Sequence, residues 1–146
     1  MNQQILDFIK NERVGVLAVE MLDGSPHAAT VHIANTENPL QFFFETYKDY
    51  RKSESLFGRD KSRASLVVGC NEQNRQTVQL DGEVRLLKND EEKKLFEEVY
   101  LGKFPEKLEK SKDPKVVFFT FIPNWWRFTG WMKPEGKVVI SSEDKQ

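Results

Sequence analysis

Two adjacent cations, Arg51 and Lys52, follow an aromatic segment that ends at Thr46. The polar stretch around them has helical character, so both can lie beside free N–H groups at the start of a helix. Two fixed cations near such donors can bind a phosphate through charge-assisted hydrogen bonds. Adjacent charges more often lie on a solvated surface, so at this point both interpretations stay open.

The chain contains two histidines, His27 and His32, and one cysteine, Cys70. On a strand, a spacing of five residues turns the two histidines to opposite faces. A zinc site needs three or four converging ligands, and Cys70 does not complete one. The sequence therefore predicts no metal site, and it gives both histidines structural roles. It also contains no glycine-rich phosphate loop and no Gly-x-Ser-x-Gly nucleophile motif.

Three tryptophans, Trp125, Trp126 and Trp131, lie within seven residues. A tryptophan favours an interface that covers its ring and gives its N–H a partner. These residues can close a barrel or form a dimer surface. Alternatively, at least one of them lines the wall beside a planar aromatic ligand.

Short apolar segments predict that strands position these residues. We expect strands over about residues 14–20, 27–34, 40–46, 63–69, 77–87 and 116–122, with a further short one at 138–140. Residues 35–39 are expected to form a loop. Helices are expected over 3–11, over 49–58 and from Asn89, which forms a capping box with Glu92. Residues 102–115 are expected to be a solvated helix or loop.

No helix separates the first three predicted strands, which excludes a parallel sheet of βαβ units. The expected fold is therefore mainly β with helices, a six-stranded antiparallel barrel. At 146 residues the chain fits a single domain, 1–146, with a frayed tail from about residue 141. The net charge of −1 provides no basic field for nucleic acid, and no apolar segment is long enough to span a bilayer. With no signal peptide and one unpaired cysteine, we expect a cytoplasmic protein.

Taken in order, the motifs resemble those of the pyridoxamine 5′-phosphate oxidase-like FMN-binding split barrels, and more closely the short members of the general-stress-protein-26 type. The resemblance covers about residues 5–130. It rests on four segments: Val14–Val19 with Asp23-Gly24-Ser25-Pro26-His27, Phe44-Glu45-Thr46 with Arg51-Lys52, Leu56 with Arg63-Ala64-Ser65-Leu66, and Arg75-Gln76 with Val78 and Asp81-Gly82-Glu83.

The resemblance implies FMN as the cofactor, bound at the interface of a homodimer with a small-molecule substrate. Thr46, Arg51 and Lys52 would contact the phosphate. Strand two (Thr30, Val31 and His32) would lie along the isoalloxazine ring. Gln76 or Thr77 would face that ring, and Trp126 of the second subunit would complete the site.

Several departures change what the resemblance implies about activity. The two flavin-contacting cations of the oxidase's second strand fall at Ala29 and Ala34, and Glu45 replaces the tyrosine before the threonine. The arginine-leucine-histidine run that binds the pyridoxal substrate has no counterpart after Trp131. A true pyridoxamine 5′-phosphate oxidase is therefore not expected, and no catalytic residue is assigned.

Three functions remain open at this point. The leading hypothesis is an FMN-dependent oxidoreductase, in which the flavin carries the redox chemistry. The second is a non-enzymatic flavin-binding or stress-associated protein. The third is a related split barrel that uses F420 or haem, with His27 or His32 available as an axial ligand.

Overall fold

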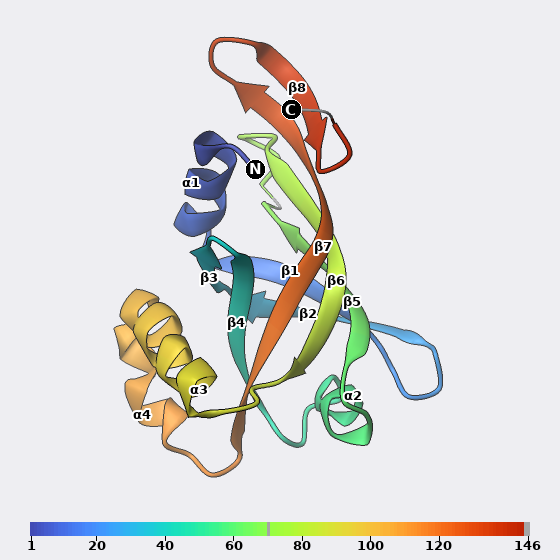
Figure 1. Ribbon diagram of the computed structural model, residues 1–146, viewed down its shortest axis with the longest axis vertical. Coiled ribbons are helices and arrows are strands. Elements are labelled where there is room, and N and C mark those ends of the chain that lie inside the picture. The colour runs from blue at the N-terminus through green and yellow to red at the C-terminus, as the bar shows by residue number, and fades with distance from the viewer. Residues whose placement is uncertain (70, 145–146) are drawn as a thin grey trace.

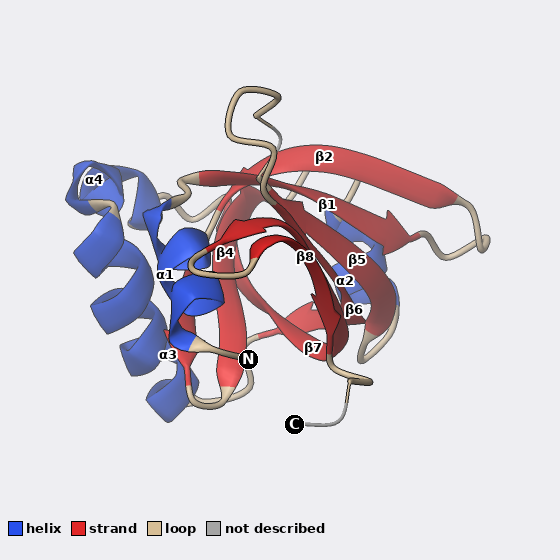
Figure 2. Cartoon of the chain, turned by 90° about the horizontal axis from the view of Figure 1, so that it is seen from above, coloured by secondary structure: helices blue, strands red, loops and turns tan. Residues whose placement is uncertain are grey.

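Eight antiparallel strands curl into an open barrel in the computed structural model, which describes residues 1–69 and 71–144 (Figures 1 and 2). Cys70 lies outside the described residues. The strands are β1 (Val14–Glu20), β2 (Pro26–His32), β3 (Ala34–Glu37), β4 (Leu40–Tyr47), β5 (Ser62–Val68), β6 (Thr77–Leu86), β7 (Val116–Met132) and β8 (Gly136–Ser141). They pair in the order β2-β1-β5-β6-β7-β4-β3, and β8 pairs with β7. β2 and β3 stand at the two ends of this order, so the barrel is split there. The fold class expected from the sequence is confirmed.

Helical segments cover the two ends and one side of the barrel. They are α1 (Gln3–Asn11), α2 (Ser53–Gly58), α3 (Asp90–Phe96), the π-helix η1 (Glu97–Leu101), the 3₁₀-helix η2 (Pro105–Lys107) and α4 (Leu108–Ser111). α1 lies near the upper end and α2 near the lower end, while α3 and α4 lie together outside one side (Figures 1 and 2). Ile5 of α1 and Leu56 of α2 are buried in the barrel core, so both helices close that core against water.

Side chains along each strand alternate between the barrel core and the outer face. In β1, Gly15, Leu17 and Val19 are buried, and their neighbours point outward. Leu17 pairs with Leu66 of β5, which in turn pairs with Leu80 of β6, so one apolar layer continues across the sheet. This register fixes which residues reach the outer face.

A second, smaller core lies between the outer face and the α3–η1 segment. It contains Ala34, Phe43, Phe96, Tyr100 and Phe104, all of them buried. Phe96 stacks on Tyr100 with ring centroids 4.9 Å apart, and Tyr100 packs on Phe104 at 5.1 Å. The helical layer is therefore attached to β3 and β4 by aromatic packing.

β7 is longer than the sequence predicts, because it runs without interruption through the tryptophan segment to Met132. Its first half pairs with β4 and its second half with β8, while β6 pairs along most of it. The register shifts at Asp81/Gly82, where a bulge bends the two strands. The single strand β7 therefore forms hydrogen-bonded pairs in both halves of the barrel.

Three predicted boundaries differ from the structure. The loop expected over 35–39 contains strand β3, whose Ala34 pairs with Phe43. The helix expected over 49–58 begins only at Ser53, so Arg51 and Lys52 precede it. The tail begins after β8, and the Ser142 N–H donates to the Trp126 carbonyl at 3.0 Å. The cap at Asn89 is confirmed, because its side chain accepts from the Glu92 N–H at 2.9 Å.

Gly82 at the bulge tests this packing. A Cβ placed there would lie 2.1 Å from the Ile122 carbonyl oxygen of β7, a backbone atom that cannot rotate away. We expect Gly82→Ala to lower the free energy of unfolding by about 1–3 kcal/mol, measured by urea denaturation. The matched control is Gly102→Ala, since a Cβ at Gly102 meets nothing within 4 Å and its backbone is helical. That variant should be more stable by up to about 1 kcal/mol. Equal stabilities of Gly82→Ala and wild type would contradict this account of the bulge.

Candidate functional site

The segment after β4 carries the cations that the sequence assigns to a phosphate. Lys52 is only 9% exposed, and its ammonium lies 4.7 Å from the centroid of the Tyr50 ring. Burial lowers the pKa of Lys52, and the charge of Lys110 lowers it further. Arg51 is exposed, and its charge acts on Asp23 in the β1–β2 turn. Lys52 is therefore buried against an aromatic ring, whereas Arg51 lies at the surface near Asp23.

Three serines hold Lys52 in this place. The Ser55 hydroxyl donates to the Lys52 carbonyl at 2.9 Å, and the Ser53 hydroxyl donates to the Tyr47 carbonyl at 2.7 Å. The Ser62 hydroxyl donates to the Ser55 carbonyl at 3.1 Å. All three serines are buried, so these bonds fix the short α2 helix to the end of β4 and the start of β5.

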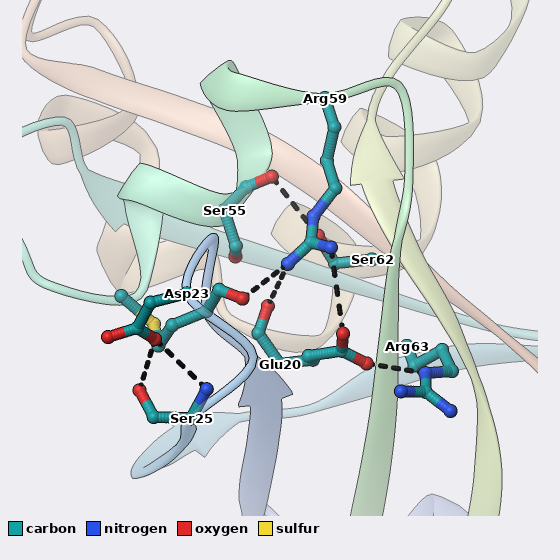
Figure 3. Close-up of polar contacts among 8 residues, drawn as sticks. Glu20, Asp23, Ser25, Ser55, Arg59, Ser62 and Arg63 are labelled. Atoms are coloured by element: carbon teal, nitrogen blue, oxygen red, sulfur yellow. Dashed lines mark hydrogen bonds and ion pairs between the residues drawn. The ribbon is translucent and has the colours of Figure 1, made fainter.

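Arg59 ties the other end of α2 to β1 (Figure 3). Its Nη2 donates to the Glu20 carbonyl at 2.7 Å and to the Met21 carbonyl at 2.6 Å. The Glu20 carboxylate pairs with Arg63 and lies 3.7 Å from Arg59 Nη1. This network fixes the position of α2 against the barrel and, through it, the position of Lys52.

The same network borders an open hollow of about 550 Å³ on the outer face of β1, β5 and β6. Its charged lining is already paired, since Glu20 binds Arg63 and the Ser65 hydroxyl donates to Asp81 Oδ1 at 2.6 Å. We therefore infer that these groups stabilise this end of the barrel, and we do not assign them to ligand binding.

Thr46 and Glu45 are neighbours on β4 but face opposite sides of the sheet. Thr46 shares the barrel face with Phe44, and its buried hydroxyl has no hydrogen-bond partner among the described residues. Glu45 shares the outer face with Phe43, beneath the helical layer, and its side chain is fully buried. The anion that replaces the oxidase's tyrosine therefore does not lie on the face of Thr46.

Glu45 faces two lysines of the helical layer. Lys110 Nζ of α4 lies 3.5 Å from Glu45 Oε1, and neither carboxylate oxygen has a hydrogen-bond partner among the described residues. Burial raises the pKa of Glu45, while the charges of Lys110 and Lys107 oppose that rise. Glu45 is thus a buried acid whose nearest opposite charge comes from α4.

The sequence analysis did not predict a role for Lys107 and Lys110, which lie in the segment expected to be solvated. Their spacing contains a signal, because Lys103, Lys107 and Lys110 recur at intervals of four and three, as on one helix face. Burial lowers the pKa of Lys103 to about 8, and the Lys103 ammonium donates to the Glu12 carbonyl. The lysines of this face turn toward the protein.

His32 ends β2 on the outer face and meets the same lysines. Lys107 Nζ lies 3.0 Å from His32 Nδ1, and the imidazole packs edge-on against Phe104 at 5.3 Å. Burial lowers the pKa of His32, and the charges of Lys107 and Arg13 lower it further. A lowered pKa favours the neutral ring at pH 7. Because an ammonium can only donate, His32 accepts at Nδ1 and has its proton on Nε2.

The other residues predicted from strand two are divided between the two faces. Thr30 is exposed on the outer face beside His32, whereas Val31 is buried in the barrel core. His27 pairs with the inward-facing Val19, so the two histidines lie on opposite faces, as expected.

Gln76 and Trp126 lie away from Lys52, where β6 and β8 pair with the second half of β7. Gln76 Nε2 donates to the Trp131 carbonyl at 2.9 Å, so Gln76 is tied to the β7–β8 hairpin. Trp126 packs against the barrel core, and Trp131 is exposed. Within one chain, the structure does not bring these two residues to the cations.

The described residues contain no cluster of three or more histidine, cysteine, aspartate or glutamate side chains that could hold a metal ion. Across the same part of the chain, no helix is both long and apolar enough to cross a bilayer.

Comparison with solved structures shows the same fold in several proteins. A haem-binding protein from Mycobacterium smegmatis superposes with a TM-score of 0.73 at 15% identity, over 92% of this chain and 54% of that one. The chain thus spans about half the length of that protein. A Clostridium acetobutylicum protein related to general stress protein 26 gives a TM-score of 0.67 at 14% identity, over 95% and 92% of the two chains. The general stress protein 26 from Bacillus anthracis gives 0.64 at 16% identity, over 86% and 91%.

These identities are too low to show more than the fold, and no curated protein sequence matches the chain. The family model described as pyridoxamine 5′-phosphate oxidase, in contrast, matches residues 1–130, which is most of the sequence. That match includes β4, the two cations after it and the lysines of η2 and α4. The chain belongs to the pyridoxamine 5′-phosphate oxidase family.

Proposed function

We propose that this protein binds FMN at the interface of a cytoplasmic homodimer and works as a flavin-dependent oxidoreductase on a small molecule. The observation that carries the proposal is Lys52. It is nearly buried, it forms no ion pair with a carboxylate among the described residues, and it follows the β4 threonine at the spacing that the family uses for the phosphate. A buried cation without a partner costs stability, and a bound phosphate would offset that cost.

The remaining residues suit this ligand. The Thr46 hydroxyl is buried on the barrel face without a partner among the described residues, so it can donate to an acceptor of the ligand on that side of β4. Arg51 is exposed and free to turn toward the phosphate. Thr30 and the Nε2–H of His32 provide donors on the outer face of β2, along which the ring would lie. Bound FMN would supply the hydride or electron transfer, and the protein would supply binding and orientation.

Gln76 and Trp126 would then belong to the site of the opposite subunit, because they lie away from Lys52 in their own chain. The substrate remains unassigned, since the oxidase's pyridoxal-binding run is missing after Trp131. A flavin-binding protein without turnover would use the same residues. An absorbance spectrum of the purified protein, followed by NADH or NADPH oxidation assays, separates these two functions.

Lys52 provides the direct test. Truncating one partner of a buried charged pair costs about 2–5 kcal/mol, so Lys52→Ala should weaken FMN binding by roughly 30- to 3000-fold. Flavin-fluorescence titration measures this change. Riboflavin lacks the phosphate, so its affinity should stay the same in the variant. Lys48→Ala is the matched control, because Lys48 is exposed in the same β4–α2 connection and should leave both affinities unchanged.

Equal weakening of FMN and riboflavin by Lys52→Ala would assign Lys52 to the fold. If wild-type protein bound neither flavin, the proposed function itself would be rejected.

The homodimer rests on the part of the outer face that no helix covers. In the β7–β8 hairpin, Thr129 pairs with Val139 and Trp131 pairs with Lys137, so these side chains share one face. Trp131 and Val139 are each 60% exposed. Large exposed apolar side chains on one sheet face are typical of a contact surface.

We therefore expect light scattering at micromolar concentration to give twice the mass of one chain. Trp131→Asp should shift the protein toward the monomer, because it replaces the largest exposed apolar side chain of the proposed contact with a charge. Lys133→Asp, in the exposed turn between β7 and β8, is the control and should remain dimeric. A monomeric wild type would rule out a flavin site that two subunits share.

A further inference from the structure

We infer that Lys110 of α4 is a third phosphate-binding cation beside Arg51 and Lys52, and that the η2–α4 segment supplies positive charge that strand two lacks. This inference rests on the proposed function and adds a residue and a segment to it. In the sequence, the oxidase's flavin-contacting cations of strand two correspond to Ala29 and Ala34, so Arg51 and Lys52 are the cations left among the site residues that the resemblance implies. In the structure, two further cations, Lys107 of η2 and Lys110 of α4, act on Glu45 of β4.

Two tyrosines connect Lys110 with Lys52. The Lys110 ammonium lies 4.8 Å from the ring centroid of Tyr47, and the Lys52 ammonium lies 4.7 Å from that of Tyr50. The two rings contact each other edge-to-face, with their centroids 5.3 Å apart. The ammonium groups therefore flank one tyrosine pair. They are close enough for the charge of Lys110 to lower the pKa of Lys52.

The local charge is not balanced within the described residues. Lys107 and Lys110 act on one buried carboxylate, Glu45, and Lys110 also acts on Lys52. These three cations with one anion leave an excess of two positive charges. Glu106 also acts on Lys107, but it is engaged by Arg13 at 2.7 Å. A phosphate carries close to two negative charges at pH 7, so its binding would offset this excess.

Glu45 gives Lys110 its position. The Glu45 side chain is fully buried, and its contact with Lys110 at 3.5 Å lacks hydrogen-bond geometry. The Lys110 side chain keeps 36% of its surface exposed, so its ammonium retains free donors on the solvent side. Glu45 thus anchors the lysine from beneath, and a phosphate can bind the same ammonium from outside.

The test compares two lysines of one segment. Lys110→Gln removes the charge but keeps a polar side chain, and Lys112→Gln changes a lysine that is 63% exposed and paired with Glu109. FMN and riboflavin affinities are measured for both variants and for wild type by fluorescence titration. We expect Lys110→Gln to weaken FMN about tenfold, or about 1.4 kcal/mol, and to leave riboflavin unchanged. Lys112→Gln should change neither affinity, and Lys110→Arg should restore FMN binding.

Lys110→Gln also removes the cation nearest to Glu45, which can disturb the fold. The double variant Glu45→Gln/Lys110→Gln removes both charges, so it should fold while showing the same selective loss of FMN affinity. Full FMN affinity in the double variant, or equal weakening of both flavins, would overturn the role of Lys110. If wild type binds FMN more tightly than riboflavin and Lys52→Ala removes that preference, the proposed function stands whatever Lys110 does.

Discussion

The alternation of side chains along β4 decides which groups can share a site. Phe42 and Phe44 point into the barrel, and Phe43 and Glu45 point to the helical layer. A slip of one residue would exchange the two sets, placing a carboxylate in the apolar core. The register with β7 prevents this, because Phe42 pairs with Phe121 and Phe44 stacks on Phe119 at 4.9 Å. The aromatic core of the barrel thereby fixes the outward position of Glu45.

The buried position of Glu45 lowers the free energy of unfolding. A buried carboxylate without hydrogen bonds loses its hydration, and an ion pair at 3.5 Å returns only part of that loss. The aromatic packing of Phe96, Tyr100 and Phe104 on Phe43 supplies the stability of the helical layer instead. Burial raises the pKa of Tyr100, and the charge of Glu45 raises it further, so that phenol stays protonated. The ion pair therefore orients α4 on a layer that apolar packing holds in place.

Local signals in the sequence predict most strands of the barrel and the Asn89 cap, because each depends on neighbouring residues. The motif from Thr46 to Lys52 comes from the family resemblance, and the helix expected around it begins only at Ser53. The opposite faces of His27 and His32 also follow from spacing alone. The helical layer is different. Lys103, Lys107 and Lys110 share a helix face in the sequence, yet only the packing of Phe104 and Tyr100 on β3 and β4 turns that face inward. Long-range packing likewise extends β7 through the tryptophans and pairs β3 with β4, where the sequence suggests a polar loop.

The state of His32 bears on the flavin that we propose for this fold. An axial histidine binds iron through the lone pair of a deprotonated ring nitrogen. In this chain Lys107 donates to Nδ1, and the lowered pKa keeps the ring neutral, so Nε2 carries the proton and offers no lone pair. His27 faces the barrel side of β2, away from the lysines. A protonated Nε2 is instead a hydrogen-bond donor, which suits the carbonyl and nitrogen acceptors of an isoalloxazine ring. Under the proposed function, the Nε2–H of His32 would therefore donate to the flavin and not bind a metal. The haem-binding protein from Mycobacterium smegmatis has the same fold at 15% identity.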